Sequence, residues 1–216
     1  MGYKAIIWDL DGTLLDTLQD LAGAVNHSLE AYSLPVKTKE EIRAIVGRGI
    51  RHLVENAVPT GTDPAITDAV FGEFCAYYAA HSADATAPYA GIPAMLEKLS
   101  RAGVKMAIVS NKADFAVQDL VMRYFGEEIT LAVGAREDIP KKPAPDMVEY
   151  ALARLGVTKA EAAYVGDSEV DVLTARNTGM DCLAVNWGFR SRETLREAGA
   201  QRIFSTPQEL MDGILG

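Results

Sequence analysis

Two aspartates, Asp9 and Asp11, stand one residue apart at the end of the apolar run from Ala5 to Trp8, with Gly12 and Thr13 directly after them. Short apolar runs that end at a turn signal are typical of buried strands in a parallel sheet. In such sheets the chemistry takes place beyond the carboxyl ends of the strands. If the strand period of two persists to its end, both carboxylates lean the same way and repel each other. A divalent cation such as Mg²⁺, which prefers oxygen ligands, would remove this conflict.

The same stretch has a structural interpretation as well. Asp-Gly is a common turn pair, so Asp11 and Gly12 alone are equally typical of a plain turn. A calcium-binding EF-hand loop is excluded, because its glycine stands five positions after the first aspartate and Gly12 stands three after Asp9. The interpretation therefore depends on partners elsewhere in the chain.

Further polar residues follow other predicted strands. One apolar run, 104–109, ends at Ser110 and Asn111, and another, 162–165, ends at Gly166 and Asp167. Taken singly, Ser110, Asn111 and Asp167 are also typical helix caps. Lys142 stands between prolines, where a lysine is typically a solvated loop charge. Asp171 is equally typical of a surface residue. Their joint occurrence, in order, favours a shared site. The candidate partners are Ser110, Asn111, Lys142, Asp167, Ser168 and Asp171.

Acids, a hydroxyl, an amide and one lysine form a set suited to a phosphate group together with Mg²⁺. A carboxylate can attack phosphorus and form an aspartyl-phosphate, which divides one difficult step into two. A second acid can protonate the leaving alkoxide and then take a proton from the attacking water. Lysine and a metal stabilise charge on the phosphoryl oxygens, and hydroxyl and amide groups donate hydrogen bonds to them.

The elements that position this set fall into two parts. From about residue 88 onward, predicted strands alternate with helices, which indicates an α/β fold with a doubly wound parallel sheet. Residues 16–87 are instead predicted to be all helical. The expected domains are therefore 1–15 with 88–216 as the α/β core, and 16–87 as a helical insertion after the first strand. An insertion at this point leaves from the edge that carries the acids and is expected to act as a lid.

Local signals support the boundaries of these elements. Capping boxes are predicted at Thr17 to Asp20 and at Thr38 to Glu41, and Asp63 precedes Pro64 as a helix start. A strand is predicted at 129–133, an edge strand at 203–204, and a last helix capped by Thr206. These elements complete the α/β alternation.

Composition limits the class of protein. The 216 residues are 49% hydrophobic and 24% charged, which is typical of a globular protein. A net charge of −9 argues against nucleic-acid binding, and no apolar run is long enough to cross a membrane. Because a strand is predicted from the first residues onward, we expect no signal peptide, and Cys75 and Cys182 are expected to be free thiols. We therefore expect a cytoplasmic protein, a monomer or homodimer, that acts on a small phosphorylated metabolite.

The motifs together resemble the phosphatases of the haloacid dehalogenase superfamily, over essentially the whole chain. The resemblance rests on Asp9 to Thr13, Ser110-Asn111, Lys142-Pro143 and Gly166 to Asp171. It implies a Rossmann-like core with an inserted cap and a hydrolase that needs Mg²⁺. Dehalogenases of the superfamily lack the second acid of the first motif, so the presence of Asp11 favours phosphoryl transfer.

The resemblance also implies a role for each site residue. Asp9 would be the nucleophile and Asp11 the general acid and base. Mg²⁺ would be held by the side chains of Asp9 and Asp167 and the backbone carbonyl of Asp11. The implied phosphate-binding residues are Gly12, Ser110, Asn111 and Lys142, and Ser168 and Asp171 would support the metal site from behind.

Further short motifs resemble those of the phosphoglycolate phosphatase-like members of the superfamily, notably Asp16 to Leu21, Val46 to Gly49 and Val185 to Gly188. In the expected cap, Arg48 stands between two glycines, where it is predicted either to bind an anionic group of the substrate or to be a solvated loop residue. Other interpretations stay open: a β-phosphoglucomutase-like phosphomutase, a pyrophosphatase or nucleotidase of the same superfamily, or, from another class, a regulatory domain that accepts a phosphoryl group on aspartate.

Overall fold

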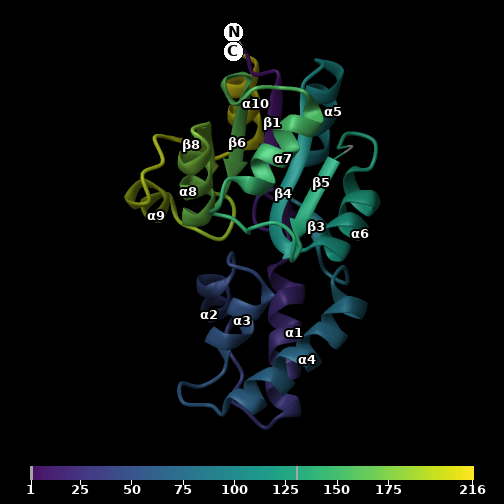
Figure 1. Cartoon of the computed structure of the whole chain (residues 1–216), viewed down its shortest axis with the longest axis vertical. Helices are drawn as coiled ribbons and strands as arrows, with labels where there is room; N and C mark the ends of the chain where they lie inside the picture. The colour runs from purple at the N-terminus through teal and green to yellow at the C-terminus, as the bar shows by residue number, and fades with distance from the viewer. Residues whose placement is uncertain (1, 130) are drawn as a thin grey trace. The chain divides into compact units, whose positions relative to one another are not determined.

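The computed structural model describes residues 2–129 and 131–216. It divides into two compact units, one formed by Met1–Leu15 and Pro88–Gly216 and the other by Asp16–Ala87. The first unit contains a six-stranded sheet in the order β5-β4-β1-β6-β7-β8, and every strand pairing in it is parallel (Figure 1). This confirms the predicted α/β class. The strands are β1 (Ala5–Trp8), β4 (Lys105–Ala113), β5 (Leu131–Ala135), β6 (Ala162–Gly166), β7 (Asp181–Val185) and β8 (Arg202–Phe204).

The central strand β1 explains the apolar run at the start of the sequence. It lies between β4 and β6, and all four of its side chains are fully buried. Ile7 packs toward Val148 of the helix α7 (Asp146–Leu155), whereas its neighbours along the strand face the other side of the sheet. Because both faces are covered, every position of β1 must be apolar.

The register of these strands determines where the polar residues meet. Trp8 of β1 pairs with Ile108 of β4 and with Val165 of β6. The residues that follow these three positions therefore leave the sheet at the same level. The chain runs from β1 to β4 and β5 on one side and then crosses to β6 on the other. Such a change of direction is where α/β sheets place their sites.

Helices cover the sheet of the first unit. Among them, α7 packs against β1, β4 and β5, and α5 packs against β4 and α10. These helices are α5 (Ile92–Arg101), α6 (Asp114–Phe125), α7 (Asp146–Leu155), α8 (Glu169–Thr178), α9 (Arg192–Glu197) and α10 (Pro207–Leu215).

The second unit is helical, with α1 packed against α4 and α2, and α3 packed against α4. Its chain enters through β2 (Leu15–Asp16) and leaves through β3 (Ala87–Pro88), which pair as a two-stranded sheet. The helices are α1 (Leu18–Ala31), α2 (Lys39–Ile45), α3 (Ile50–Ala57) and α4 (Pro64–His81).

The predicted helix starts at Thr17, Thr38, Asp63 and Thr206 are confirmed, but one of the predicted capping boxes is wrong. Thr38 and Glu41 form the predicted capping box, and the side chains of Asp63 and Thr206 cap α4 and α10. Thr17 is the N-cap of α1 but makes no side-chain cap, and the Asp20 carboxylate, which would complete the box, accepts from Ala85 and Thr86 instead. The strand predicted at 129–133 begins at Leu131, and position 130 lies outside the described residues. Helix α9 was not predicted.

The Asp20 carboxylate joins the first turn of α1 to the end of the same helical unit. It accepts hydrogen bonds from the backbone N–H of Ala85 at 2.9 Å, from the N–H of Thr86 at 2.8 Å and from the Thr86 hydroxyl at 2.7 Å. Asp20 and Thr86 are both buried. The contact therefore fixes the segment that leads out of the unit.

We expect Asp20→Ala to lower the free energy of unfolding by about 2–3 kcal/mol, because three donors lose a charged acceptor and two of them are buried. Urea unfolding measures this loss. Glu30→Ala, which removes an exposed acid from the same helix, is the matched control. Equal stability of the two variants would contradict the structural role of Asp20.

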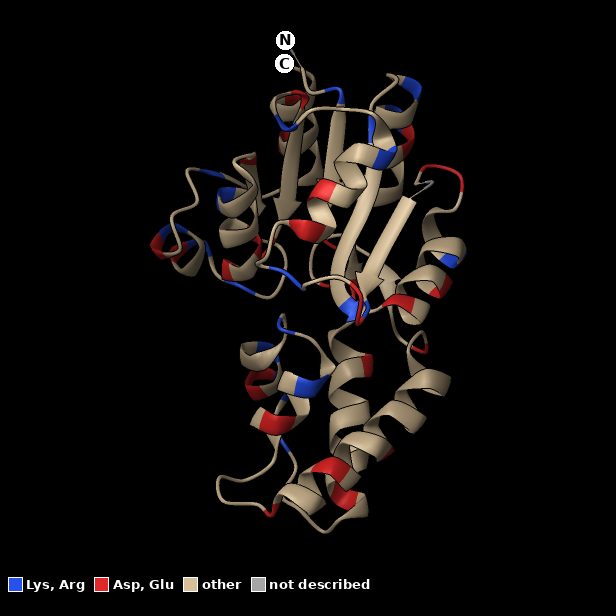
Figure 2. Ribbon diagram, in the orientation of Figure 1, with Lys and Arg blue, Asp and Glu red and all other residues tan. Residues whose placement is uncertain are grey.

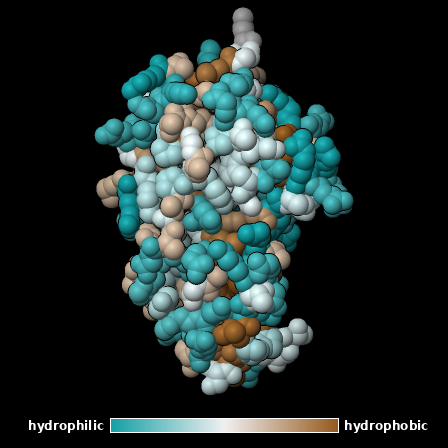
Figure 3. Space-filling view, turned by 180° about the vertical axis from the view of Figure 1, so that it is seen from behind, coloured by the Kyte–Doolittle hydropathy of each residue, from teal (hydrophilic) through white to brown (hydrophobic). Residues whose placement is uncertain are grey.

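The surface carries charges of both signs. Lys and Arg are interspersed with Asp and Glu over each unit (Figure 2), and the face seen in Figure 3 is mostly hydrophilic with small, separated hydrophobic patches. Cys75 and Cys182 are free thiols, as predicted. Among the described residues, no helix combines the length and apolar character that crossing a membrane requires.

Candidate active site

The centre of the candidate site is an ion pair between Asp9 and Lys142. Asp9 follows β1 directly, and its N–H donates to the carbonyl of Val165 at 2.8 Å. Lys142 comes from the loop between β5 and α7, and its Nζ lies 2.7 Å from Asp9 Oδ1. The Lys142 side chain is only 2% exposed. The structure thus brings together two predicted site residues that are 133 positions apart in the sequence.

Asp171 and Tyr164 complete the surroundings of the Lys142 ammonium group. Its Nζ also donates to Asp171 Oδ1 at 2.8 Å and to the Tyr164 hydroxyl at 3.0 Å. Tyr164 in turn donates to Asp171 Oδ1 at 3.0 Å. The other oxygen of Asp171 accepts from the Ser168 hydroxyl at 2.6 Å and from its N–H at 3.1 Å. Both oxygens of Asp171 are therefore engaged, which suits a supporting position.

Asp167, at the end of β6, is held on both of its carboxylate oxygens. Thr13 Oγ1 donates to Oδ1 at 3.2 Å, and the N–H of Phe189 donates to Oδ2 at 2.6 Å. Gly12 has a φ of +85°, and a Cβ there would collide with the Asp167 carboxylate. A Cβ at Gly188 would collide with the same carboxylate and with the Gly12 carbonyl. The backbone thus approaches Asp167 closely at two glycines, where a side chain would not fit.

The charges of this cluster are perturbed by burial and by one another. Burial, aided by the charge of Asp171 and opposed by Lys142, raises the pKa of Asp9 to about 7. Burial and the charges of Asp171 and Asp9 also raise the pKa of Asp167 well above its ordinary value. Burial works against the charged form of Lys142, but Asp171 and Asp9 outweigh it and raise the Lys142 pKa. When its three carboxylates are ionised, the cluster carries more negative charge than its lysine neutralises.

This donor set fits a divalent cation. Carboxylate oxygens of Asp9, Asp167 and Asp171 lie within 4.8 Å of one another, and all three residues are buried. Hard cations take such oxygen ligands, and a bound cation would compensate the surplus negative charge. Asp171 accepts four of the hydrogen bonds described above and Asp167 accepts two, so Asp167 has more of its oxygen lone pairs left for a cation.

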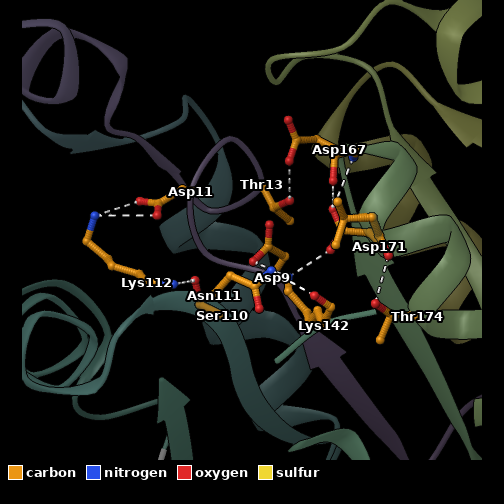
Figure 4. A network of polar contacts seen from close by, with 12 residues as sticks. Asp9, Asp11, Thr13, Ser110, Asn111, Lys112, Lys142, Asp167, Asp171 and Thr174 are labelled. Atoms are coloured by element: carbon orange, nitrogen blue, oxygen red, sulfur yellow. Dashed lines mark hydrogen bonds and ion pairs between the residues drawn. The ribbon is translucent and has the colours of Figure 1, made fainter. Parts of the chain in front are cut away.

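Asp11 lies apart from this cluster and has its own cation. Lys112 Nζ lies 3.1 Å from Asp11 Oδ1 and 3.4 Å from Oδ2. Figure 4 shows the Asp11 side chain turned toward Lys112, whereas Asp9 lies beside Lys142. The two acids of the first motif are thus held by different lysines.

The remaining predicted residues lie at the same sheet edge or in the helical unit. The Ser110 hydroxyl accepts from the N–H of Lys112 at 3.2 Å, and Asn111 Nδ2 donates to the carbonyl of Lys142 at 3.1 Å. Both Ser110 and Asn111 are buried. Arg48 is exposed and lies between α2 and α3 of the second unit.

Sequence reasoning assigned no role to three residues of the site: Thr13, Lys112 and Tyr164. Lys112 stands two positions after Ser110, and a strand period of two places both side chains on one side, which was an available signal. In the sequence Tyr164 is an ordinary buried strand residue. Its hydroxyl acquires polar partners only through the fold, so the sequence contained no sign of them.

Comparison with known proteins places the chain among hydrolases and phosphatases. The family model of haloacid dehalogenase-like hydrolases matches residues 6–185. Phosphoglycolate phosphatase of Xanthomonas campestris pv. campestris is 34% identical over 189 residues, which cover 87% of this chain and 85% of that protein. N-acetylmuramic acid 6-phosphate phosphatase of Pseudomonas aeruginosa is 29% identical, covering 98% of this chain and 95% of that protein.

A solved structure is similar over the whole chain. The crystal structure of a protein from Lactobacillus delbrueckii subsp. bulgaricus, provisionally named a phosphoglycolate phosphatase, is 38% identical with a TM-score of 0.95 and full coverage of both chains. Fold, motifs and sequence similarity agree. The chain therefore belongs to the haloacid dehalogenase-like hydrolases, as a phosphatase similar to the phosphoglycolate phosphatases.

Proposed function

We propose that this phosphatase hydrolyses a small phosphomonoester, most closely of the phosphoglycolate type, through a covalent aspartyl-phosphate on Asp9 and with Mg²⁺. The observation that carries the proposal is the buried cluster in which Lys142 contacts both Asp9 and Asp171 while Asp167 lies beside them. A second acid, Asp11, stands two residues after the nucleophile. This combination supplies a nucleophile, a metal site and a proton donor at one sheet edge.

In the first step a carboxylate oxygen of Asp9 attacks phosphorus, and the bond from phosphorus to the ester oxygen breaks. Asp11 gives its proton to the departing oxygen, so the alcohol leaves neutral. In the second step a water molecule attacks the phosphoryl group and Asp11 takes its proton. The bond from phosphorus to Asp9 then breaks, releasing inorganic phosphate and restoring the carboxylate.

The other residues bind and orient the phosphoryl group. Lys142 supplies a fixed positive charge, and Ser110, Asn111 and the backbone around Gly12 supply hydrogen-bond donors. Asp9, Asp167 and the Asp11 backbone carbonyl would hold Mg²⁺, which when bound supplies positive charge to the phosphoryl oxygens. Ser168 acts through Asp171, whose carboxylate it anchors.

Residues 16–87 are proposed to act as a cap that excludes bulk water during turnover, with hinges near Asp16 and at 86–91. Arg48, exposed between Gly47 and Gly49, is proposed to bind a carboxylate or a second phosphate of the substrate. Two free thiols suit a reducing compartment, so we also propose a cytoplasmic location. A monomeric or homodimeric state stays a prediction.

The proposal is tested with purified protein, Mg²⁺ and a panel of esters: phosphoglycolate, N-acetylmuramic acid 6-phosphate, other sugar phosphates, nucleotides and pyrophosphate. We expect phosphate release that EDTA abolishes and that added Mg²⁺ restores, with the highest kcat/KM for phosphoglycolate.

Arg48→Ala is expected to raise KM for phosphoglycolate about tenfold and to leave KM for methyl phosphate unchanged, because only the former carries a carboxylate.

The products separate this proposal from its rivals. A higher kcat/KM for a sugar phosphate than for phosphoglycolate would leave the proposed chemistry in place and change the assigned substrate. An isomerised sugar phosphate would indicate a phosphomutase, and two phosphates from pyrophosphate a pyrophosphatase. A stable phosphoprotein without turnover would indicate a regulatory phospho-acceptor domain. Release that persists in EDTA would contradict the role of the metal.

A further inference from the structure

Lys112 is a buried lysine that the mechanism above does not use. Its side chain is 2% exposed, and its ammonium group lies near both carboxylate oxygens of Asp11. Burying a lysine is unfavourable unless a charge partner compensates it. Asp11 is such a partner, and its own side chain is 16% exposed.

The local backbone directs Lys112 toward Asp11. Lys112 lies near the end of β4, where the pairing with β5 shifts register between Val109 and Ala113. Irregularities of this kind re-aim side chains next to active sites. The N–H of Lys112 also donates to the hydroxyl of Ser110 at 3.2 Å, which ties the lysine backbone to a phosphate-binding residue. Lys112 is therefore held both at its backbone N–H and at its ammonium group.

The two lysines divide the two acids of the first motif between them. Lys142 holds Asp9 and Asp171, and Lys112 holds Asp11 (Figure 4). Without Lys112, the Asp11 carboxylate would lose its neighbouring cation and the contact that fixes its side-chain orientation. An acid that serves both steps must stay within reach of the leaving oxygen and, later, of the water.

We propose that Lys112 is a positioning residue that fixes the Asp11 side chain for proton transfer to the leaving group. Asp11 enters this step protonated, and the carboxylate that it becomes is the charge partner of Lys112. This inference rests on the proposed role of Asp11 as general acid and base. It assigns Lys112 no contact with the phosphoryl group. Its effect must therefore depend on how much the leaving group needs a proton, and it must vanish when Asp11 is absent.

The test compares kcat/KM of Lys112→Met for glycerol phosphate, whose alkoxide needs a proton, and for p-nitrophenyl phosphate, whose phenolate hardly does. We expect a loss of about 100-fold for the first and less than about tenfold for the second. Lys112→Arg is expected to recover part of the loss. Lys98→Met removes an exposed lysine of α5 and is expected to change neither value.

A double-mutant cycle with Asp11→Asn separates positioning from direct binding. If Lys112 acts through Asp11, the double variant is no more than about twofold worse than Asp11→Asn alone. Equal losses for both esters, or independent effects in the cycle, would overturn the inference. Should Lys112→Met not fold, the same ester comparison with Lys112→Arg decides. Asp9→Asn is assayed beside them: activity in that variant would contradict the proposed function instead.

Discussion

Asp9→Asn is expected to lower kcat by about 10⁴-fold or more, because an amide carries no charge and cannot attack phosphorus as a carboxylate does. The fold should survive. Asparagine is nearly the same size as aspartate, and the Lys142 ammonium group keeps Asp171 and Tyr164 as partners. Steady-state release of phosphate from the best ester of the panel measures the effect.

The matched control for this variant is Asp119→Asn, which changes an exposed acid of α6 in the same unit. It should retain wild-type kcat and the same thermal unfolding temperature. Wild-type turnover by a folded Asp9→Asn protein would contradict the assignment of the nucleophile. Loss of the fold in Asp9→Asn, visible as a lost unfolding transition, would contradict the expected tolerance of the cluster for asparagine.

Lys142→Met is expected to damage both activity and stability. It removes the ammonium group that Asp9, Asp171 and Tyr164 share, and leaves the two carboxylates without their cation. Breaking a buried pair in this way destabilises a protein by about 3–5 kcal/mol. The loss of a fixed charge beside the phosphoryl group should lower kcat by about 100-fold or more.

The stability loss should depend on pH in a direction that the pKa of Asp9 determines. That pKa is raised to about 7 with Lys142 present and must rise further without it. A raised carboxyl pKa lowers the stability of the folded state progressively as pH rises from the unfolded pKa to the folded pKa, because the unfolded chain releases the proton first. The higher folded pKa of the variant extends this loss to higher pH than in the wild type. The destabilisation by Lys142→Met should therefore be larger at about pH 8 than at about pH 5.5.

Urea unfolding at the two pH values measures this difference, with Lys141→Met, an exposed neighbouring lysine, as control. The control should lose little stability at either pH. A loss for Lys142→Met that is equal at both pH values, or larger at the lower one, would contradict the electrostatic account of the cluster.

The parts of the fold that sequence reasoning predicted are those with short-range signals. The fully apolar strand β1, the capping box at Thr38 and the Asp63-Pro64 start of α4 each follow from neighbouring residues alone. Thr17 and Asp20 show the same spacing as Thr38 and Glu41, yet Asp20 binds Thr86, 66 positions away. A local pattern cannot reveal that a distant backbone N–H competes for a carboxylate.

The same distinction applies to the candidate site. Residues such as Asp9 and Asp167 could be grouped from the sequence because each follows a strand, and parallel strands bring their carboxyl ends together. The partners within the group depend on tertiary detail. Neither the contact of Tyr164 with Lys142 nor the separate pairing of Lys112 with Asp11 follows from strand order. These contacts require the register and the irregular end of β4.

The most direct test of the mechanism is to trap the phosphoryl group on Asp9. Asp11→Asn protein is mixed with p-nitrophenyl phosphate and Mg²⁺, quenched in acid and digested, and its peptides are weighed by mass spectrometry. Because this variant lacks the base that activates water, we expect one phosphoryl group to accumulate on Asp9. We expect none in the double variant that carries both Asp9→Asn and Asp11→Asn. Release of p-nitrophenol without any phosphopeptide, or a phosphoryl group on another residue, would contradict the account.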